Sequence, residues 1–254
     1  MDSIVVLQQV PDARAGLPVA PEGRDLDRDR LQWVTNPFDE FALEEALLLR
    51  EDLGGTVIAV ALDAPGADEA LYRALALGAT GAVLLTGLSP GWVSGRSRAE
   101  ALAAWIRTQA YDLVLSGVQA PDDLDGQLPV LLAGLLGHPH ASVIVEVEAD
   151  GTRLIVTQEH SGGRLARLAL TPPAVLGIQS SLRDPRYVSE MRIRLASMGG
   201  GVQRVAATPG ALSGAVPRHL APPPAARRAE MLEGDAAEVA AALVGLLRAR
   251  GLLA

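Results

Sequence analysis

The chain has 254 residues and a formal net charge of −8 at pH 7; 49% of its residues are hydrophobic but only 3% are aromatic. This length can bury a large aliphatic core, whereas the acidic balance and the absence of an arginine-rich face argue against a nucleic-acid partner. The sequence contains neither cysteine nor lysine, which excludes disulfides, thiolate metal sites, thiol nucleophiles and Schiff-base lysines. It opens without a signal-peptide pattern and no apolar run reaches membrane-spanning length, so we expect a cytoplasmic protein without direct membrane insertion.

The first half of the chain alternates between strand patterns and helix patterns. Short aliphatic runs predict strands at residues 3–10, 56–62, 81–85 and 111–116. Between them, helical spacing of apolar residues predicts helices over 36–50, 67–77 and 97–110, and a further helix from residue 127. A charged loop or small hairpin at 13–30 interrupts the series. The alternation predicts an α/β fold, with a parallel sheet and helices on both faces, whose ligands bind beyond the carboxyl ends of the strands.

The start of the helix at 36–50 carries several agreeing signals. Asn36 is a good N-cap, Pro37 sits where a missing N–H costs nothing, and Asp39 and Glu40 place negative charge in the first turn. The free N–H groups of such a helix can face a phosphate or a flavin edge. On these residues alone, a well-capped surface helix remains the simpler interpretation.

The second candidate segment follows the strand at 111–116. The chain leaves that strand through Gly117, crosses an acidic loop with Asp122, Asp123 and Asp125, and enters the next helix near Gln127. A loop in this place can present backbone N–H groups to a phosphate. The aspartates also suggest a magnesium or calcium site, but their spacing matches no calcium loop, so turn-forming and capping roles are favoured. The sequence has no GxGxxG fingerprint and no P-loop.

The rhythm changes after residue 137. Alternating residues at 141–148 and 152–158 predict a hairpin, and further strands are predicted at 164–170 and 174–178. Residues 183–201 are polar, residues 206–228 are rich in Pro and Ala and predict an extended arm, and residues 235–250 predict an amphipathic helix. We therefore expect a nucleotide-binding α/β domain at 1–200, followed at 201–254 by an arm and helix that dock onto a partner subunit.

Seven segments together resemble one known family. QQVPD, NPFDEFALEEAL, AVALDAP followed by RALALGA, LVLSGVQAPDDLDGQ, PAVLGI and LRDPRY occur in an order and spacing similar to those of the beta subunit of electron transfer flavoproteins. The resemblance covers essentially the whole chain, and the closing helix resembles that family's carboxyl-terminal helix. It implies a Rossmann-like fold of the adenine nucleotide alpha hydrolase-like type.

The resemblance also implies a function. The family forms a heterodimer with a larger, FAD-carrying alpha subunit, which shuttles electrons from acyl-CoA and related dehydrogenases of fatty acid oxidation to a membrane quinone reductase. The beta subunit buries AMP, or a second FAD in bifurcating members. The cofactor-binding positions that carry over are Val6, Asn36, Pro37, Phe38, Asp39, Leu62, Gly117, Val118, Gln119, Ala120, Pro121, Asp122, Asp123, Leu124, Asp125, Gly126, Gln127 and Leu128. By the same resemblance Phe38 lies near the flavin and Glu159 at the subunit contact.

The chain departs from the family at several of these points. Gln8 and Val118 stand where the family usually has lysine. Gly126-Gln127-Leu128 stands where the family commonly has Asn-Gln-Thr, at the end of the site that binds the phosphate. These changes remove charge-assisted bonds of roughly 1.5–3 kcal/mol each. Glu190 replaces a leucine that anchors in a dehydrogenase pocket, which implies a different donor.

Residues 158–161 depart as well: Gln158 stands where a basic residue is usual, and His160-Ser161 where acidic residues are common. The chain therefore resembles a divergent member, and two functions stay open. One is a redox subunit in which the flavin does the chemistry, without a catalytic residue of this chain. The alternative is a nucleotide-binding or scaffolding paralogue with a degenerate site and no electron transfer. A hydrolase is the weakest candidate, because no GxSxG elbow is present.

Overall fold

The protein is described from a computed structural model, which describes all residues except 89–92, 124–125, 208–215, 223–228, 230 and 254. By its internal contacts the chain divides into two compact units, Met1–Leu220 and Ala221–Ala254. Each unit is described by itself.

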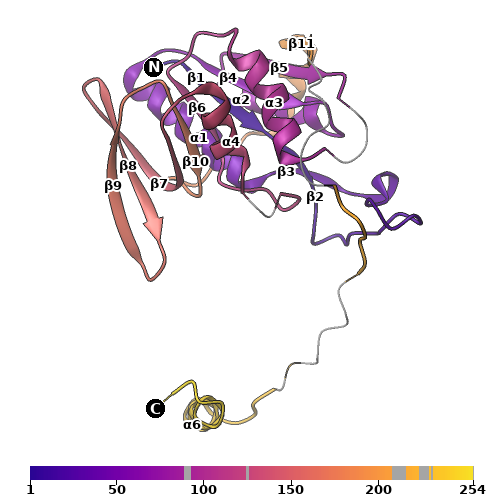
Figure 1. Ribbon diagram of the computed structural model, residues 1–254, viewed down its shortest axis with the longest axis vertical. Helices are drawn as coiled ribbons and strands as arrows, with labels where there is room; N and C mark the ends of the chain where they lie inside the picture. Colours follow the sequence, from indigo (N-terminus) through magenta and orange to yellow (C-terminus); the bar gives the residue numbers. More distant parts are fainter. Residues whose placement is uncertain (89–92, 124–125, 208–215, 223–228, 230, 254) are drawn as a thin grey trace. The chain divides into compact units, whose positions relative to one another are not determined.

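The first unit is built on a mostly parallel sheet (Figure 1). Its strands are β1 (Ser3–Leu7), β4 (Val57–Leu62), β5 (Gly81–Thr86), β6 (Leu113–Gly117), β7 (His140–Asp150), β8 (Arg153–His160), β9 (Arg164–Leu170), β10 (Ala174–Ile178) and β11 (Val202–Ala206). They form a nine-stranded sheet in the order β11-β5-β4-β1-β6-β10-β7-β8-β9. Neighbours are parallel from β11 to β7, and β8 and β9 continue the sheet as an antiparallel extension. The predicted α/β fold with a hairpin region is confirmed.

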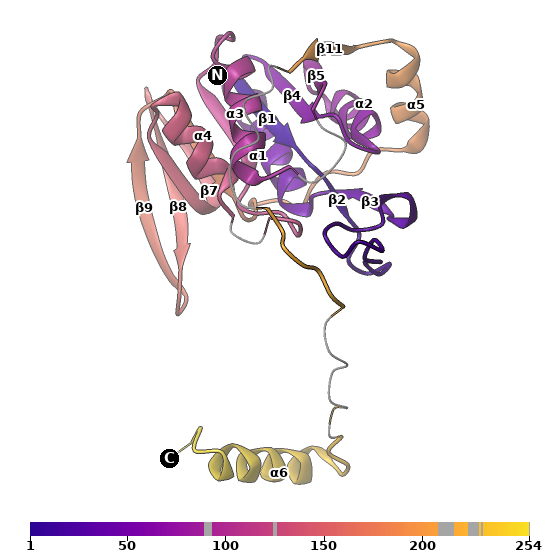
Figure 2. The same cartoon turned by 45° about the vertical axis from the view of Figure 1, so that its right-hand side comes forward.

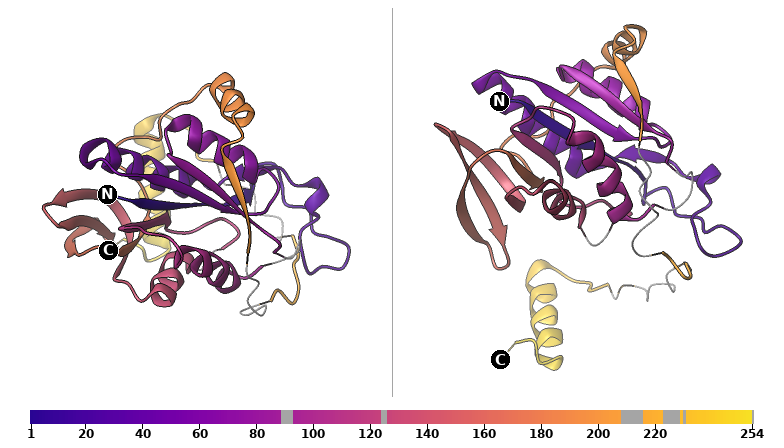
Figure 3. Two further views of the ribbon diagram at one scale, coloured as in Figure 1. Left: turned by 90° about the horizontal axis from the view of Figure 1, so that it is seen from above. Right: turned by 45° about the horizontal axis from the view of Figure 1, so that its top comes forward.

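Helices cover both faces of this sheet, as expected (Figures 2 and 3). The helices α1 (Pro37–Leu53) and α2 (Ala67–Leu77) pack on one face, and α3 (Gly95–Ile106) and α4 (Leu128–Leu136) pack on the other. Alternate residues of β1 serve the two layers: Val5 and Leu7 join the core under α1 and α2, and Ile4 and Val6 join the core under α3 and α4. A strand buried on both faces accounts for the continuous aliphatic run in the sequence.

The order of the strands places a topological switch point between β1 and β6. From β1 the chain passes through α1 to β4 on one side, whereas β6, on the other side of β1, is reached from β5 through α3. The connections at the carboxyl ends of β1 and β6 therefore diverge. Open α/β sheets bind ligands in the crevice at such a point.

The first strand is shorter than predicted. β1 ends at Leu7, and residues 9–11 form β2 (Gln9–Pro11), which pairs with β3 (Trp33–Thr35) in a separate two-stranded sheet. The break falls at Gln8, whose N–H donates to the Asp39 carboxylate at 2.8 Å and whose carbonyl accepts from the Asn36 N–H at 2.9 Å. The run was predicted as one strand because both pieces are apolar.

Besides β3, the sequence analysis missed a helix and an edge strand of this unit. Within the polar segment 183–201 lies a helix, α5 (Glu190–Met198), which buries only Ile193 and so shows little helical patterning in the sequence. β11 lies in the region that we assigned to the arm, and it pairs in parallel with β5 at the edge of the sheet. The excursion at 13–30 contains a short 3-10 helix, Arg28–Arg30, and an antiparallel bridge between Val19 and Leu26.

The second unit contains α6 (Ala236–Ala249). Asp235 caps it by accepting from the N–H groups of Ala237 and Glu238 at 2.9 Å, and the Glu238 carboxylate accepts from the Asp235 N–H at 3.0 Å, which completes a capping box. The predicted arm at 206–228 falls largely outside the described residues. Among the helices that the structure describes, none combines the length and the apolarity needed to cross a membrane.

Candidate functional site

Asp39 joins the ends of the two strands at the switch point. It lies in the first turn of α1 and is fully buried; its Oδ2 accepts from the Gln8 N–H at 2.8 Å and its Oδ1 from the Gly117 N–H at 2.6 Å. Burial raises the pKa of Asp39 to about 7, although both amide donors oppose this by favouring the charged form. One carboxyl group thus links the carboxyl ends of β1 and β6 to the start of α1.

Asn36 makes the second link. Its Nδ2 donates to the Gln119 carbonyl at 2.9 Å, so the side chain bridges to the loop after β6 and forms no cap hydrogen bond with α1. Asn36 therefore occupies the predicted N-cap position of α1, but the expected cap hydrogen bond from its side chain is absent, because the amide is turned toward the loop. Its Oδ1 is buried and has no partner in the described part of the chain. A buried orphan acceptor is costly unless a ligand or water donates to it.

Gly117 is where the strand end and the helix start approach most closely. A Cβ atom on Gly117 would lie 2.5 Å from Phe38 Cβ and 2.7 Å from Asp39 Oδ1. Any side chain larger than hydrogen would push these segments apart. The two candidate segments, predicted separately from the sequence, therefore contact one another directly.

The structure limits which N–H groups can meet a ligand. The Gly117 N–H is taken by Asp39, and the Val118 N–H donates to the Ile178 carbonyl at 2.8 Å. The expectation that the loop presents N–H groups to a phosphate thus fails at these two residues, because the protein satisfies them itself. Gly126 also donates within the loop, to the Asp123 carbonyl at 3.2 Å.

An arginine that sequence reasoning missed lies in the same region. Arg98, in the first turns of α3, pairs with Asp122 at 2.6 Å and reaches Gln8 Oε1 at 3.3 Å. Only 16% of the Arg98 side chain and 15% of the Asp122 side chain are exposed, and Asp122 Oδ1 is buried without a partner in the described residues. No motif marks Arg98, since only the packing of α3 across the sheet brings it to this edge.

The remaining predicted site residues lie at different depths. Val6 is buried within β1 and Leu62 ends β4, the neighbouring strand. Of the helix start and the loop, Ala120 and Leu128 are buried, Pro37, Gln119, Pro121 and Gln127 are exposed, and Phe38, Val118, Asp122, Asp123 and Gly126 are half-buried. Leu124 and Asp125 lie outside the described residues.

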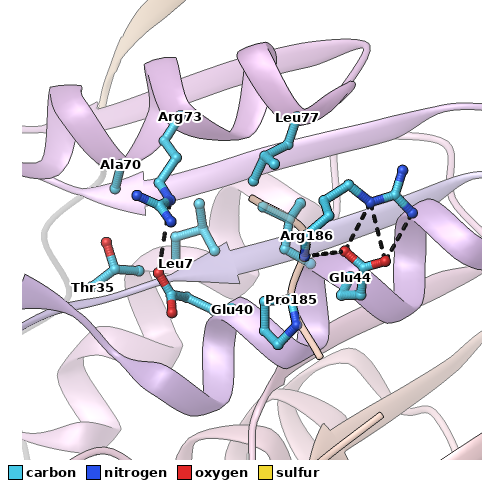
Figure 4. Close-up of a pocket in the computed structure, with 10 residues that line it drawn as sticks. Leu7, Thr35, Glu40, Glu44, Ala70, Arg73, Leu77, Pro185 and Arg186 are labelled. Carbon is cyan, nitrogen blue, oxygen red and sulfur yellow. Dashed lines mark hydrogen bonds and ion pairs between the residues drawn. The ribbon is translucent and has the colours of Figure 1, made fainter. Parts of the chain in front are cut away.

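Two cavities lie beside this region. A small one of about 20 Å³ lies between α1 and α2 and is bordered by the ion pairs Arg73–Glu40 and Arg186–Glu44 (Figure 4). It has room for little more than a water molecule. A larger, open cavity of about 680 Å³ is lined by β2, β3 and the start of α2, and Pro37 and Pro121 are the predicted site residues on its wall.

The chemistry of the switch point fits an adenine nucleotide. Asn36 Oδ1 is a buried acceptor without a partner in the described residues, which suits an amino or hydroxyl donor of a base or ribose. Arg98 brings a cation that suits a phosphate and is paired with Asp122 in this structure. Asn36 and Arg98 would hold such a ligand. No group of three or more potential metal ligands occurs among the described residues, which exclude Asp125 of the acidic loop.

The structure also shows the positions of the two residues expected to contact partner proteins, Glu159 and Glu190. Glu159 lies near the end of β8 and accepts from Gln179 Nε2 at 2.8 Å. Glu190 is exposed and starts α5, which presents Met191, Leu195 and Met198 with 61–77% of each residue exposed.

Comparisons with known proteins agree with this fold and its motifs. The family model of the electron transfer flavoprotein domain matches residues 25–219. An electron transfer flavoprotein subunit beta of Clostridium acetobutylicum is 35% identical over 193 residues, 76% of this chain and 74% of that protein. One of Bacillus subtilis is 30% identical over 258 residues, 98% of each chain, and the caffeyl-CoA reductase-Etf complex subunit CarD of Acetobacterium woodii is 31% identical over 74% of this chain and 72% of its own length. The chain therefore belongs to the electron transfer flavoprotein family, among its beta subunits.

Proposed function

We propose that this chain is the nucleotide-binding subunit of a heterodimeric electron transfer flavoprotein. It binds AMP, or a second FAD, at the switch point and supports an alpha subunit that carries FAD. The flavin supplies the electron chemistry. The residues of this chain bind the nucleotide and support the alpha subunit, and none of them is proposed to act as an acid, a base or a nucleophile.

The observation that carries the proposal is the set of contacts around Asp39. Its two carboxylate bonds bring the ends of β1 and β6 to the start of α1, and beside them lie buried acceptors with no partner in the described residues. Buried polar atoms in native proteins nearly always have a hydrogen-bond partner. Buried acceptors without a partner at a switch point therefore indicate a ligand. Family membership supports the same ligand class.

The test is to identify what the protein carries. The full chain is purified alone and after co-expression with its alpha subunit, denatured, and its released small molecules are identified and counted by mass spectrometry. From the complex we expect a yellow colour and, beyond the FAD of the alpha subunit, about one further adenine nucleotide per beta chain. Release of no adenine nucleotide from the chain alone, and of no more than the alpha subunit's FAD from the complex, would contradict the proposal.

A control variant links the ligand to the site. Asn36→Ala removes the bridge to Gln119 and one orphan acceptor, and should lower the amount of nucleotide retained. Gly134→Ala, on an exposed position of α4 with no neighbour within 4 Å of the new Cβ, should retain as much as the wild type.

A second candidate is a nucleotide-binding or scaffolding subunit without electron transfer. It is favoured by the internal use of the Gly117 and Val118 N–H groups and by the residues Gly126-Gln127-Leu128, which lack the amide and the hydroxyl of the Asn-Gln-Thr that the family resemblance implies. The two candidates differ in one measurement. Reduction of the complex's flavin by an acyl-CoA dehydrogenase with its substrate supports the redox subunit, whereas a complex without reducible flavin supports the scaffold.

The donor is proposed to dock at the segment around Glu190. This charged residue suits a dehydrogenase with a polar or basic contact better than one with an apolar pocket. We further propose that the complex works in the cytoplasm and passes electrons to a quinone reductase, with fatty acid oxidation as the source.

A further inference from the structure

We propose that Arg98 binds the phosphate of the nucleotide. While no ligand is bound, the Asp122 carboxylate pairs with the Arg98 guanidinium at the position that the phosphate would take. This inference rests on the proposed function and adds a specific residue to it. It concerns phosphate recognition alone, which can be tested separately from nucleotide binding as such.

The position of Arg98 needs an explanation of its own. A cation in the first turns of a helix lies near the positive end of the helix dipole, where it is disfavoured. Here the side chain crosses from α3 to the strand ends, contacting Gln8 after β1 and Asp122 after β6. It is only 16% exposed. A positive charge is thus held inside the switch point, where β1 and β6 diverge.

The pairing with Asp122 leaves part of the carboxylate unused. A guanidinium can grip a carboxylate or a phosphate with two parallel N–H bonds. The described contact is a single short bond from Arg98 Nη2 to Asp122 Oδ2, and Oδ1 stays buried without a partner in the described residues. A carboxylate held by one oxygen is easier to replace than one held by two, and a phosphate oxygen carries the charge needed to replace it.

The composition of the chain agrees with this role. It contains no lysine, so arginine is the only side chain of this chain that is always cationic at neutral pH. Arg98 contacts the Gln8 side chain directly after β1 and so brings such a cation to the ends of the strands.

The exchange has a thermodynamic consequence. A ligand phosphate has to displace Asp122 from Arg98, and the energy of that ion pair is subtracted from the energy of phosphate binding. Neutralising Asp122 should then strengthen binding of a phosphorylated ligand. It should do so without strengthening binding of the same ligand lacking its phosphate.

The experiment compares AMP with adenosine. The full chain is stripped of nucleotide, and the dissociation constants of both ligands are measured by calorimetry for the wild type, Arg98→Gln, Asp122→Asn and Arg96→Gln. Arg96 is the matched control, since it lies two residues away in α3 but pairs with Glu100 on the surface. If the released nucleotide is FAD, FAD is measured as well, and AMP and adenosine, which correspond to its adenosine half with and without a phosphate, remain the matched pair.

We expect Arg98→Gln to weaken AMP binding by about tenfold or more while changing adenosine binding less than about twofold. Arg96→Gln should change neither, and Asp122→Asn should tighten AMP binding alone. Because Arg98→Gln leaves Asp122 unpaired, the double variant Arg98→Gln/Asp122→Asn is also measured. It removes both charges, keeps the fold free of an unpaired carboxylate, and should show the same loss of preference for AMP over adenosine.

Three outcomes separate the two proposals. If AMP binds the wild type and Arg98→Gln weakens AMP and adenosine equally, or weakens neither, Arg98 does not bind the phosphate and the proposed function stands. If both Arg98 variants lose only the preference for AMP, both proposals are supported. If the wild type binds none of AMP, adenosine and FAD, the proposed function fails and this inference fails with it.

Discussion

Arg186 holds the buried carboxylate of Glu44 with both its side chain and its backbone. Arg186 Nη2 lies 2.8 Å from Oε1, Nε lies 2.9 Å from Oε2, and the Arg186 N–H donates to Oε2 at 3.1 Å. Glu44 is 4% exposed and belongs to α1, whereas Arg186 belongs to LRDPRY. The pair therefore ties together NPFDEFALEEAL and LRDPRY, two of the motifs that carry the family resemblance, across 142 residues of sequence.

This pair should contribute measurably to stability. Replacing Arg186 by Met leaves Glu44 charged, buried and unpaired, which costs 3–5 kcal/mol where both partners are fully buried. The Arg186 side chain is 31% exposed, so we expect a loss of about 2 kcal/mol in the free energy of unfolding. Urea denaturation measures it.

The double variant Glu44→Met/Arg186→Met provides the control. It removes both charges, so it should be more stable than Arg186→Met alone. Disrupting the exposed pair Arg167–Glu148 by Arg167→Met should change stability by less than about 0.5 kcal/mol. If Arg186→Met is no less stable than Arg167→Met, the pair does not hold the motifs together.

Gly117 should tolerate no side chain. In Gly117→Ala the new Cβ would lie 2.5 Å from Phe38 Cβ, and because that atom belongs to the rigid start of α1 the strand end or the helix has to move. We expect destabilisation of about 1–3 kcal/mol, in the range of overpacking. Gly134→Ala in α4 has open space around the new Cβ and should stabilise by up to about 1 kcal/mol. Equal midpoints in urea for the two variants would contradict the close approach at Gly117.

Much of the fold was predictable because its elements have strong local signals. The parallel strands are continuous aliphatic runs, and α2 and β10 have the predicted bounds, Ala67–Leu77 and Ala174–Ile178. Elements with weak local signals were missed. α5 buries one residue, and β3 has three residues that only pairing with β2 makes a strand.

The candidate site was predictable to a smaller extent. The two segments were recognised because each looks like a loop or helix start after a buried strand. That the two segments contact one another depends on hydrogen bonds between residues far apart in the sequence. Gln8 and Asp39 are 31 residues apart, and Asp39 and Gly117 are 78 residues apart. Such contacts leave no periodic trace, and neither does Arg98, whose partners come from two other elements.

The side chain of Asn36 should matter through the loop and not through the helix. Asn36→Ala removes its bond to Gln119 and leaves that carbonyl short of a donor, so we expect a loss of about 1–3 kcal/mol in the free energy of unfolding. Asn36→Asp keeps a capping oxygen but places a carboxylate oxygen against the Gln119 carbonyl. It should be at least as destabilising as Asn36→Ala, whereas a true cap would tolerate aspartate. Thermal or urea unfolding of both variants decides between the two roles, and a stable Asn36→Asp would restore the capping role.

Asp39 should make stability depend on pH in an unusual direction. Its pKa is raised from 3.8 to about 7 by burial, so between these values the folded state binds more protons than the unfolded state. Stability then falls as pH rises through this window, by no more than about 4 kcal/mol for this one group.

Asp39→Asn does not titrate and should be less stable at every pH, because its amide places N–H groups where a carboxylate oxygen accepts. The measurement is the difference in unfolding free energy between wild type and Asp39→Asn from pH 4 to pH 8. Other carboxyl groups, such as Glu45, whose pKa is also raised by burial, are common to both proteins and cancel in this difference. The advantage of the wild type should shrink as pH rises. An advantage that grows instead means that the Gly117 and Gln8 amides outweigh burial and keep Asp39 charged, with its pKa below 3.8.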